Sequence, residues 1–335
     1  MTSRIIPRSA RITGSGRYCP EKILSNSDLE KIVETTDEWI TTRTGIKERR
    51  IAADDQACSD LCYEAAKNAL DMAGVDPKDL DAIFVGTISG DTQFPATAVY
   101  VQDSLGANRA AALDVNAACS GFIYGANLAH GMISSGQMER ILVIGGEVLS
   151  KFLDWEDRDT CVLFGDGAGA VVIEACPHGE GILSTQMRSD GSLADLLIIP
   201  GGGSRKPLTE NSYLEKNQYI KMKGDGVFKY AVRAMADATR AAIDTAGVTI
   251  DEIDLLIPHQ ANARIIDAMN DRLEIPKEKV VVNLDRYGNT SAATIPIAYD
   301  EVVREGRVVP GDLVVFTGFG GGFTWGSMVF RNVLG

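Results

Sequence analysis

The sequence predicts an α/β fold made of two similar halves, and two observations lead to this prediction. Apolar stretches with the character of buried strands alternate along the chain with helical patterns, which is typical of sheets covered by helices on both faces. In addition, one helix–glycine–strand pattern occurs twice. Residues 65–81 can be laid over residues 238–254 with seven identities, including Gly74 with Gly247. The chain therefore looks duplicated.

Each copy of this pattern reads as an amphipathic helix that ends at the glycine, followed by an apolar strand at 82–86 or 255–258. Weaker echoes follow in the same order along the chain. They are 141–145 with 313–317, and Phe164-Gly-Asp-Gly with Phe319-Gly-Gly-Gly. We expect two halves, residues 1–180 and 181–335, with a functional site where they meet. The polar stretch 190–220 is predicted to be an insertion between the halves.

The composition is that of an ordinary globular protein, with 45% hydrophobic and 24% charged residues in 335. A formal charge of -13 argues against nucleic acid as a partner, because phosphate binding requires a dominant basic surface. Six cysteines without framework spacing predict reduced thiols. The first residues lack the apolar core of a signal peptide, and we expect a cytoplasmic protein without a membrane partner.

Cys119 is the first candidate for a reactive side chain. It follows the apolar strand 111–115 and opens a helix over 120–135 that is rich in glycine, alanine and apolar residues. A thiol at a helix N-terminus feels the positive end of the helix dipole. We therefore expect its pKa to be lowered and the thiolate to act as a nucleophile. The alternative is a small buried core cysteine.

His259 is one of three histidines and lies between the strand 255–258 and a helix. The carboxyl ends of strands line ligand crevices in open α/β sheets, which favours a functional role. The alternative is a structural histidine at a strand end. His130 and His178 lack this placement, and no two histidines have metal-ligand spacing, so no metal site is expected.

Asn289 lies in Arg286-Tyr-Gly-Asn-Thr-Ser, between a short strand and a helix of small residues. In the duplicated frame it falls within one residue of Cys119, which predicts two equivalent helix starts that face one cavity. An asparagine that only caps the helix is the alternative.

Two glycine-rich segments differ in what they predict. The glycines at 320–322 follow an apolar strand, and they allow backbone N–H groups to approach a substrate oxygen as oxyanion donors. A plain tight hairpin is the alternative. The segment 165–169 lacks the spacing of a nucleotide-binding loop, and we expect no cofactor there.

Together these segments resemble the β-ketoacyl-acyl carrier protein synthase III family of bacterial type II fatty acid synthesis. The likeness runs from Asp37-Glu-Trp-Ile-Thr-Thr-Arg-Thr-Gly45 to Thr324-Trp-Gly-Ser327. It implies a duplicated thiolase-like fold, a five-layer αβαβα arrangement with two mixed sheets, and a homodimer. It also implies that no cofactor is needed beyond the substrates.

The resemblance implies a condensation reaction. Cys119 would take an acyl group from an acyl-CoA, while backbone N–H groups of Cys119 and Gly321 hold the oxyanion. Acetyl-CoA is the expected starter, but the sequence leaves branched and medium-length chains equally open. His259 and Asn289 would then help malonyl-acyl carrier protein lose CO2. The resulting carbanion would attack the acyl-cysteine and give a 3-oxoacyl carrier protein.

The resemblance also assigns binding roles. Phe94 would cap the acyl pocket of the partner subunit. The residues that would hold CoA are Thr35, Trp39, Arg43, Arg158, Gly224 and Asp225. Those that would contact the acyl carrier protein are Gln260, Ala261, Asn262, Ala263 and Arg264. Lys229 and Arg233, four apart on a predicted helix, would add a basic patch, with a solvated helix face as the alternative.

Two other functions stay open at this point. One is an acyltransferase of the same fold that acylates a small hydroxyl or amine in secondary metabolism. The other is a non-catalytic acyl-CoA-binding protein.

Overall fold

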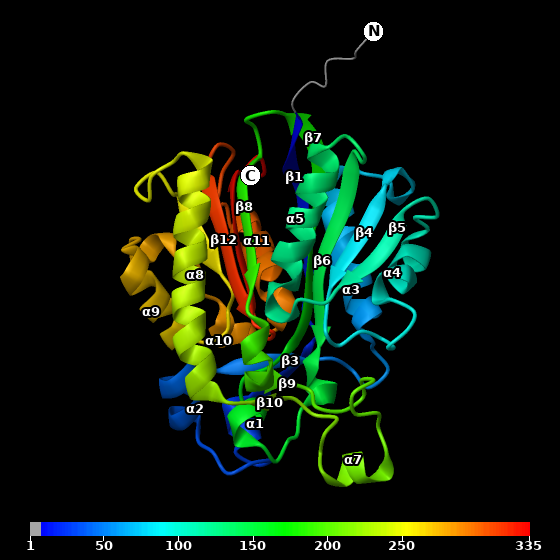
Figure 1. The fold of residues 1–335 in the computed structure, drawn as a ribbon, viewed down its shortest axis with the longest axis vertical. Helices are drawn as coiled ribbons and strands as arrows, with labels where there is room; N and C mark the ends of the chain where they lie inside the picture. The colour runs from blue at the N-terminus through cyan, green and yellow to red at the C-terminus, as the bar shows by residue number, and fades with distance from the viewer. Residues whose placement is uncertain (1–7) are drawn as a thin grey trace.

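The computed structural model describes residues 8–335, apart from the side chain of Asp225, and contains two mixed sheets (Figure 1). The first sheet has the order β1-β7-β6-β4-β5 and the second the order β11-β12-β13-β8. The strands of the first sheet are β1 (Arg8–Tyr18), β4 (Ala82–Gly86), β5 (Ala111–Val115), β6 (Arg140–Val148) and β7 (Asp166–Pro177). Those of the second are β8 (Ile182–Ser189), β11 (Leu255–Pro258), β12 (Leu313–Gly320) and β13 (Thr324–Arg331).

The strand order confirms the duplication. Read from one edge, β1-β7-β6-β4 corresponds to β8-β13-β12-β11, and each step has the same direction, antiparallel twice and then parallel. The fifth position also has a counterpart, because Val280 forms a parallel bridge with Leu256 of β11 where β5 pairs with β4. The two sheets are therefore two copies of one topology.

The helices form three layers around the two sheets (Figure 1). α5 and α11 lie between the sheets, α3 and α4 cover the outer face of the first sheet, and α8 and α9 cover that of the second. Their bounds are α3 (Cys58–Ala73), α4 (Thr97–Leu105), α5 (Gly121–Ser134), α8 (Gly224–Ala246), α9 (Ala263–Leu273) and α11 (Thr294–Arg304). This is the expected αβαβα arrangement. Within residues 8–335, none of the helices has the length and apolarity needed to cross a bilayer.

The two helices of the sequence repeat end as their glycines predict. Gly74 and Gly247 follow α3 and α8 with φ values of 66° and 71°, in the left-handed region that favours glycine. The strands β4 and β11 come next in the chain. Local chemistry therefore determines this part of each half.

The position of the insertion differs from the prediction. β8 belongs to the second sheet, so residues 190–220 lie inside the second half, between β8 and α8, instead of between the halves. The strand was missed because its sequence, Ile-Leu-Ser-Thr-Gln-Met-Arg-Ser, is largely polar. The predicted boundary at residue 180 falls between β7 and β8. The segment after β8 contains β9 (Leu197–Ile198), α7 (Glu210–Leu214) and β10 (Lys221–Met222).

Several short elements join the two halves at one end of the sheets. Two short strands, β2 and β3, pair antiparallel with each other, and four short helices lie near them. These elements are β2 (Lys22–Ser25), α1 (Asn26–Leu29), α2 (Asp37–Thr44), β3 (Glu48–Ile51), α6 (Arg158–Cys161) and α10 (Leu284–Tyr287).

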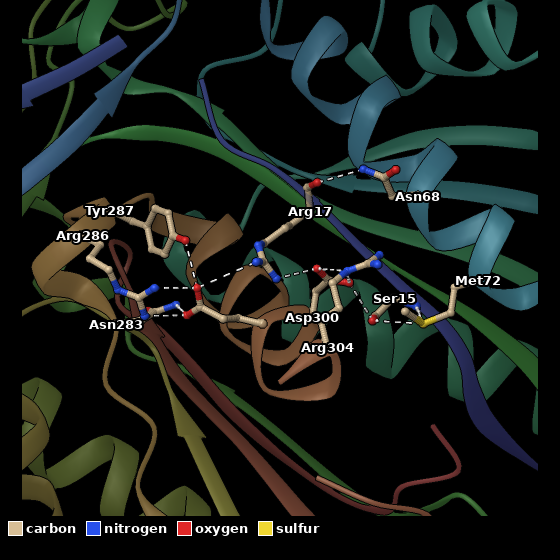
Figure 2. A network of polar contacts seen from close by, with 10 residues as sticks. Ser15, Arg17, Asn68, Met72, Asn283, Arg286, Tyr287, Asp300 and Arg304 are labelled. Atoms are coloured by element: carbon tan, nitrogen blue, oxygen red, sulfur yellow. Dashed lines mark hydrogen bonds and ion pairs between the residues drawn. The ribbon is translucent and has the colours of Figure 1, made fainter. Parts of the chain in front are cut away.

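A buried ionic network ties the central helix α11 to the first sheet (Figure 2). Asp300 is fully buried, and its carboxylate accepts hydrogen bonds from Ser15 and Arg17 of β1 at 2.9 and 2.8 Å. Arg304 adds a bond from the next turn of α11 at 2.9 Å. The charge of Asp300 is thus compensated entirely by groups that fix the helix in place.

The neighbouring Glu301 ties the same helix to the segment that leads to Asn289 (Figure 2). Its carboxylate accepts two bonds from Arg286, each 2.8 Å long, one from Tyr287 at 2.9 Å and one from Asn283 at 3.0 Å. Bidentate arginine–carboxylate pairs are geometrically demanding. Through Glu301, α11 therefore positions the chain two residues before Asn289.

We expect Asp300→Ala to lower the free energy of unfolding by about 3–5 kcal/mol, because Ser15 and Arg17 lose their buried hydrogen-bond acceptor and Arg17 keeps only a contact of 3.9 Å with Glu301. Arg304→Ala is the matched control. The Arg304 side chain is 45% exposed, and we expect a loss of about 1 kcal/mol or less. Urea unfolding followed by circular dichroism measures both, and equal losses in the two variants would contradict this account.

Candidate active site

Cys119, His259 and Asn289 line one cavity of about 620 Å³. Their exposed fractions are only 6%, 3% and 6%, so all three lie at its inner end. Trp39 and Arg43 line the same cavity and are partly or fully exposed, which places them towards its opening. The fold thus brings the three predicted groups, drawn from both halves, to the end of one passage from the surface.

Cys119 is positioned by the start of the central helix α5. It lies in a 3₁₀ turn, Ala118–Ser120, between β5 and α5. α5 begins against β4, because a Cβ on Gly86 would lie 2.5 Å from the backbone carbon of Gly121. Only glycines allow this approach, which carries the thiol to the inner end of the cavity.

The pKa of the Cys119 thiol is raised to about 12, and the expectation of a lowered pKa is wrong for the enzyme without substrate. Burial is the largest cause, since a thiolate loses its hydration there. The charge of Glu147 raises the pKa further, whereas the nearby hydroxyl of Ser291 lowers it. The free enzyme therefore holds a protonated thiol.

His259 follows β11 and is held by two hydrogen bonds. Its backbone N–H donates to Thr317 O at 2.8 Å, and its ring Nδ1 lies 2.7 Å from the hydroxyl of Thr294. Burial lowers the pKa of the imidazole to about 3. The ring is therefore neutral near pH 7 and carries one N–H.

Thr294 controls which ring nitrogen carries that proton. Its hydroxyl has a single proton, and two acceptors are within reach: Nδ1 of His259 and the carbonyl of Ser291, which lies 3.0 Å away. When Thr294 donates to Nδ1, the ring proton is on Nε2 and the ring can donate into the cavity. When Thr294 donates to the carbonyl, Nε2 is an acceptor.

Asn289 is held between the two halves with its amide orientation set. Its backbone pairs with the first half, where its N–H donates to Leu163 O at 2.9 Å and its carbonyl accepts from Gly165 N at 3.1 Å. The side-chain Oδ1 accepts from Ser291 N at 2.8 Å. The Nδ2 group then remains as a donor at the cavity. The capping alternative is thus correct for the oxygen only.

The two helix starts correspond in a different register from the one predicted. Ala118 and Ser291 have φ values of 48° and 50°, and each begins the 3₁₀ turn that precedes its central helix. In this register Ser291 corresponds to Ala118, Ala292 to Cys119, and Asn289 to Asn116. Asn289 is therefore offset from Cys119 by three residues. The sequence comparison missed this because residues 118–120 and 291–293 differ at every position, and the single identity of Asn116 with Asn289 is too weak a signal.

The glycine turn is a hairpin, as the alternative predicted, and it also lies against Cys119. It connects β12 and β13, and a Cβ on Gly320 would lie 2.6 Å from the backbone nitrogen of Cys119. Gly321 and Cys119 line a second cavity of about 890 Å³. The backbone of this turn therefore lies close to the backbone of Cys119, and the oxyanion role of Gly321 stays a prediction.

The second cavity extends from Cys119 in another direction than the passage to Trp39. Much of its wall is apolar, as expected for a space that receives a hydrocarbon chain. The apolar side chains in that wall are Ile88, Leu149, Phe152, Phe164, Leu197, Ile198, Ile199 and Ile220.

The residues expected to hold CoA differ in whether they line the passage to Cys119. The guanidinium groups of Arg43 and Arg158 lie 4.7 and 4.5 Å from the ring centre of Trp39, within cation–π range. Gly224 lines the first cavity, whereas Thr35 has a buried hydroxyl that has no hydrogen-bond partner in the described part of the chain. Asp225 is in α8, and its side chain lies outside the described residues.

The expected carrier-contact segment is only partly accessible. Gln260 is 1% exposed, and its amide donates to Pro258 O and Val281 O, so its side chain does not reach a partner. Asn262 caps α9 and bonds to the carbonyl of Arg43. The accessible or partly accessible members of the two predicted sets are Ala261, Asn262, Ala263, Arg264, Lys229 and Arg233.

Phe94 lies on the loop before α4 with 89% of its surface exposed. An exposed phenylalanine of this kind is consistent with a contact to a second subunit.

Sequence reasoning missed three polar residues behind the site: Thr294, Ser291 and Glu147. The first two belong to the segment that was already singled out for Asn289. Glu147 had a signal of its own, since it is a carboxyl group inside the apolar run of β6.

Comparisons with known proteins agree with this geometry. Residues 113–191 match the family model of 3-oxoacyl-[acyl-carrier-protein] synthase III, and residues 243–332 match the model of its C-terminal part. The chain is 52% identical to the β-ketoacyl-[acyl-carrier-protein] synthase III of Desulfitobacterium hafniense, over 96% of this chain and 98% of the relative.

Solved structures show the same likeness. The synthase III from Aquifex aeolicus superposes with a TM-score of 0.89 at 50% identity, covering 96% of this chain and 99% of the other. The priming β-ketosynthase of the R1128 polyketide pathway has a TM-score of 0.91 at 33% identity, covering 100% and 99%.

The fold and the site thus define a condensing acyltransferase of the thiolase fold. More narrowly, the chain belongs to the β-ketoacyl-[acyl-carrier-protein] synthase III family and has that family's function in fatty acid synthesis.

A thiol with a pKa of about 12 predicts a pH dependence for alkylation of Cys119 by iodoacetamide. The thiolate is the reacting form, so the rate should rise about tenfold per pH unit from about pH 7 to 10 without levelling. Mass spectrometry of the peptide that contains Cys119 follows the rate. Free cysteine, which levels near its pKa of about 8.5, is the control. A plateau of the Cys119 rate below about pH 9 would contradict the raised pKa.

Proposed function

We propose that this enzyme starts fatty acid chains by condensing an acyl-CoA with malonyl-acyl carrier protein through an acyl-Cys119 intermediate. The observation that carries the proposal is the meeting of a buried thiol, a neutral imidazole and an amide donor at the end of one passage. Acetyl-CoA is the first starter to test. The same geometry favours synthesis over simple binding, because each group has a chemical role.

In the first step the Cys119 sulfur bonds to the thioester carbon of acyl-CoA. The carbonyl oxygen becomes negative and receives the backbone N–H groups of Cys119 and Gly321, which act as preorganised donors. The bond from that carbon to the CoA sulfur then breaks, and CoA leaves as the thiolate. The acyl chain extends into the apolar second cavity.

In the second step malonyl-acyl carrier protein loses CO2. The electron pair of the broken carbon–carbon bond forms an enolate, whose oxygen accepts from Nδ2 of Asn289 and from Nε2–H of His259. This requires the tautomer in which Thr294 donates to Nδ1. The enolate carbon attacks the acyl-cysteine, and the Cys119 sulfur leaves. A dry site suits this step, because water would protonate the carbanion.

The opening of the passage suits CoA and an acidic carrier protein. Trp39 offers a flat aromatic surface, and Arg43 and Arg158 offer positive charge beside it. Lys229, Arg233 and Arg264 are exposed, and Arg264 lines the passage. A local basic region on a protein with a net charge of -13 would steer a negatively charged carrier to this face.

A homodimer in the cytoplasm completes the proposal. β5 is an edge strand with Leu113 38% exposed, and an open edge of this kind pairs readily with another strand. Phe94 lies on the loop between β4 and α4, next to that edge, and its exposed ring would reach the acyl cavity of the partner. The chemistry above needs side chains, backbone and substrates, without a cofactor.

The two half-reactions of Asn289→Ala test the assigned roles. We expect decarboxylation of malonyl-acyl carrier protein to fall about 10²–10³-fold, because an enolate donor is lost. Acylation of Cys119 by acetyl-CoA, measured by intact mass, should change little. Cys119→Ala should give no acyl adduct while keeping its circular dichroism spectrum. Equal loss of both half-reactions in Asn289→Ala would refute the role of the amide, and the absence of an adduct with any acyl-CoA in the wild type would refute the function.

The tautomer argument predicts the behaviour of Thr294. Thr294→Val removes the donor to Nδ1 of His259, and we expect decarboxylation to slow about tenfold. Thr294→Ser retains the hydroxyl and should restore the rate to within about twofold. Release of CO2 from labelled malonyl carrier protein measures both, and identical rates for the two variants would show that the hydroxyl has no such role.

A further inference from the structure

Glu147 is a buried carboxyl group that the mechanism above does not use. It lies on β6 with 0% of its surface exposed. Its Oε2 accepts hydrogen bonds from the Thr87 hydroxyl and from the N–H groups of Ile88 and Ser89, each at 3.1 Å, and also from the Ser89 hydroxyl. Oε1 has no hydrogen-bond partner among the described residues. One oxygen is thus saturated, while the other is free to accept.

The Glu147 side chain, which carries the free oxygen Oε1, faces the active site. Side chains alternate along a strand, so Glu147 points to the same side of β6 as Gly145. A Cβ on Gly145 would collide with the carbonyl oxygen of Ala292, at the start of α11, whereas one on Gly146 would collide with Cys62 of α3. Glu147 therefore faces the turn that begins with Ser291.

Ser291 lies near both Glu147 and Cys119. It is buried, and its hydroxyl has no hydrogen-bond partner in the described part of the chain. It lines the second cavity together with Cys119 and Thr87. Although it makes no hydrogen bond among the described residues, the Ser291 hydroxyl lowers the pKa of both the Cys119 thiol and the Glu147 carboxyl, which places it close to both groups.

We propose that Ser291 and Glu147 form a proton relay behind Cys119 that stores the thiol proton while the acyl-enzyme exists. The inference rests on the proposed function and adds the fate of a proton to it. As the sulfur bonds to the thioester carbon, its S–H proton passes to Ser291 Oγ. At the same time Ser291 gives its own proton to Glu147 Oε1.

The relay balances both half-reactions. In the first, the thiol and the Glu147 carboxylate become the acyl-cysteine and the Glu147 acid, and CoA leaves as a thiolate that takes a proton from water. In the second, malonyl-acyl carrier protein loses CO2 and its enolate carbon bonds to the acyl carbon. The released Cys119 sulfur recovers the stored proton through Ser291. The negative charge of the malonyl carboxylate ends on Glu147.

The surroundings of Glu147 suit this role better than those of His259. Burial raises the pKa of the Glu147 carboxyl above its ordinary value, which makes it a better proton acceptor. His259 has a pKa lowered to about 3 and holds a second proton poorly. The charge of Glu147 raises the pKa of two nearby thiols, Cys119 and Cys58 of α3, and the raised pKa of Cys58 keeps that thiol protonated.

The duplication supplies a variant that the fold tolerates. Ala118 occupies the position equivalent to Ser291 with nearly the same φ, 48° against 50°. Ser291→Ala therefore removes the hydroxyl without changing the backbone requirement. Glu147→Gln keeps an oxygen for the four donors and replaces the free oxygen by an amide group that cannot take the proton. Thr290→Val is the matched control, since it removes the neighbouring buried hydroxyl, which also lacks a partner among the described residues.

The test is the single-turnover rate of Cys119 acylation by acetyl-CoA, measured by rapid quench and intact mass between about pH 5 and 9. Ser291→Ala and Glu147→Gln should each slow acylation about 10²-fold, with an unchanged half-saturating concentration of acetyl-CoA. The double variant should be no slower than either single one, because the two act as a unit. Thr290→Val should stay within about twofold of the wild type.

The pH profile separates a relay from a structural effect. The wild-type rate should be nearly constant above the raised pKa of Glu147 and fall below it, since the protonated acid accepts nothing. Both variants should instead react through the small fraction of thiolate, so that their rates rise about tenfold per pH unit over the whole range. A plateau like that of the wild type in Glu147→Gln, or acylation of Ser291→Ala within threefold of the wild type, would overturn the relay. If Glu147→Gln does not fold, the Ser291→Ala profile decides. If the wild type is acylated normally and Ser291→Ala and Glu147→Gln are acylated as fast, only the relay is refuted. If the wild type forms no acyl adduct on Cys119, the proposed function is refuted as well.

Discussion

The close packing of two central helix starts against the sheets is the constraint on which the rest of this structure depends. α5 begins where Gly86 and Gly121 let backbone meet backbone, and α11 begins where Gly145 leaves room for the carbonyl of Ala292. A side chain at any of these glycines would push a helix start away from its strand. The same contact that holds the five layers together therefore also places Cys119 and Asn289 at one cavity.

Burial is the chemical consequence of this packing, and it acts on every ionisable group at the centre. It raises the pKa of Cys119 to about 12, lowers that of His259 to about 3 and raises that of Glu147. A site with these properties works with neutral donors and with protons that move only during the reaction. This agrees with a decarboxylative route, in which loss of CO2 generates the carbon nucleophile without a strong base.

The duplication explains how the two halves contribute different functional groups to one active site. Both helix starts retain the same backbone, with a left-handed residue at Ala118 in one copy and Ser291 in the other. The side chains on the two 3₁₀ turns have diverged, so one copy supplies the thiol and the other a hydroxyl. Asn289 and its counterpart Asn116 are identical, but of the two only Asn289 lines the cavity with His259. Glu301 and Asp300 of α11 then lock the second copy against β1 and α10 (Figure 2). The active-site residues thus come from both halves of the duplicated chain, and the packing of the halves brings them together.

The sequence by itself determined the repeated helix–glycine–strand units, the two-sheet fold and the identity of the Cys119, His259 and Asn289 group, because each depends on local pattern or on a motif. It did not place β8 in the second sheet, set the register between Cys119 and Asn289, or reveal that Gln260 is buried and that Ser291 and Glu147 lie behind the thiol. Only the tertiary structure decided these points. The physical reason is that desolvation and contact between residues more than a hundred positions apart arise from packing, and a linear pattern carries no measure of either.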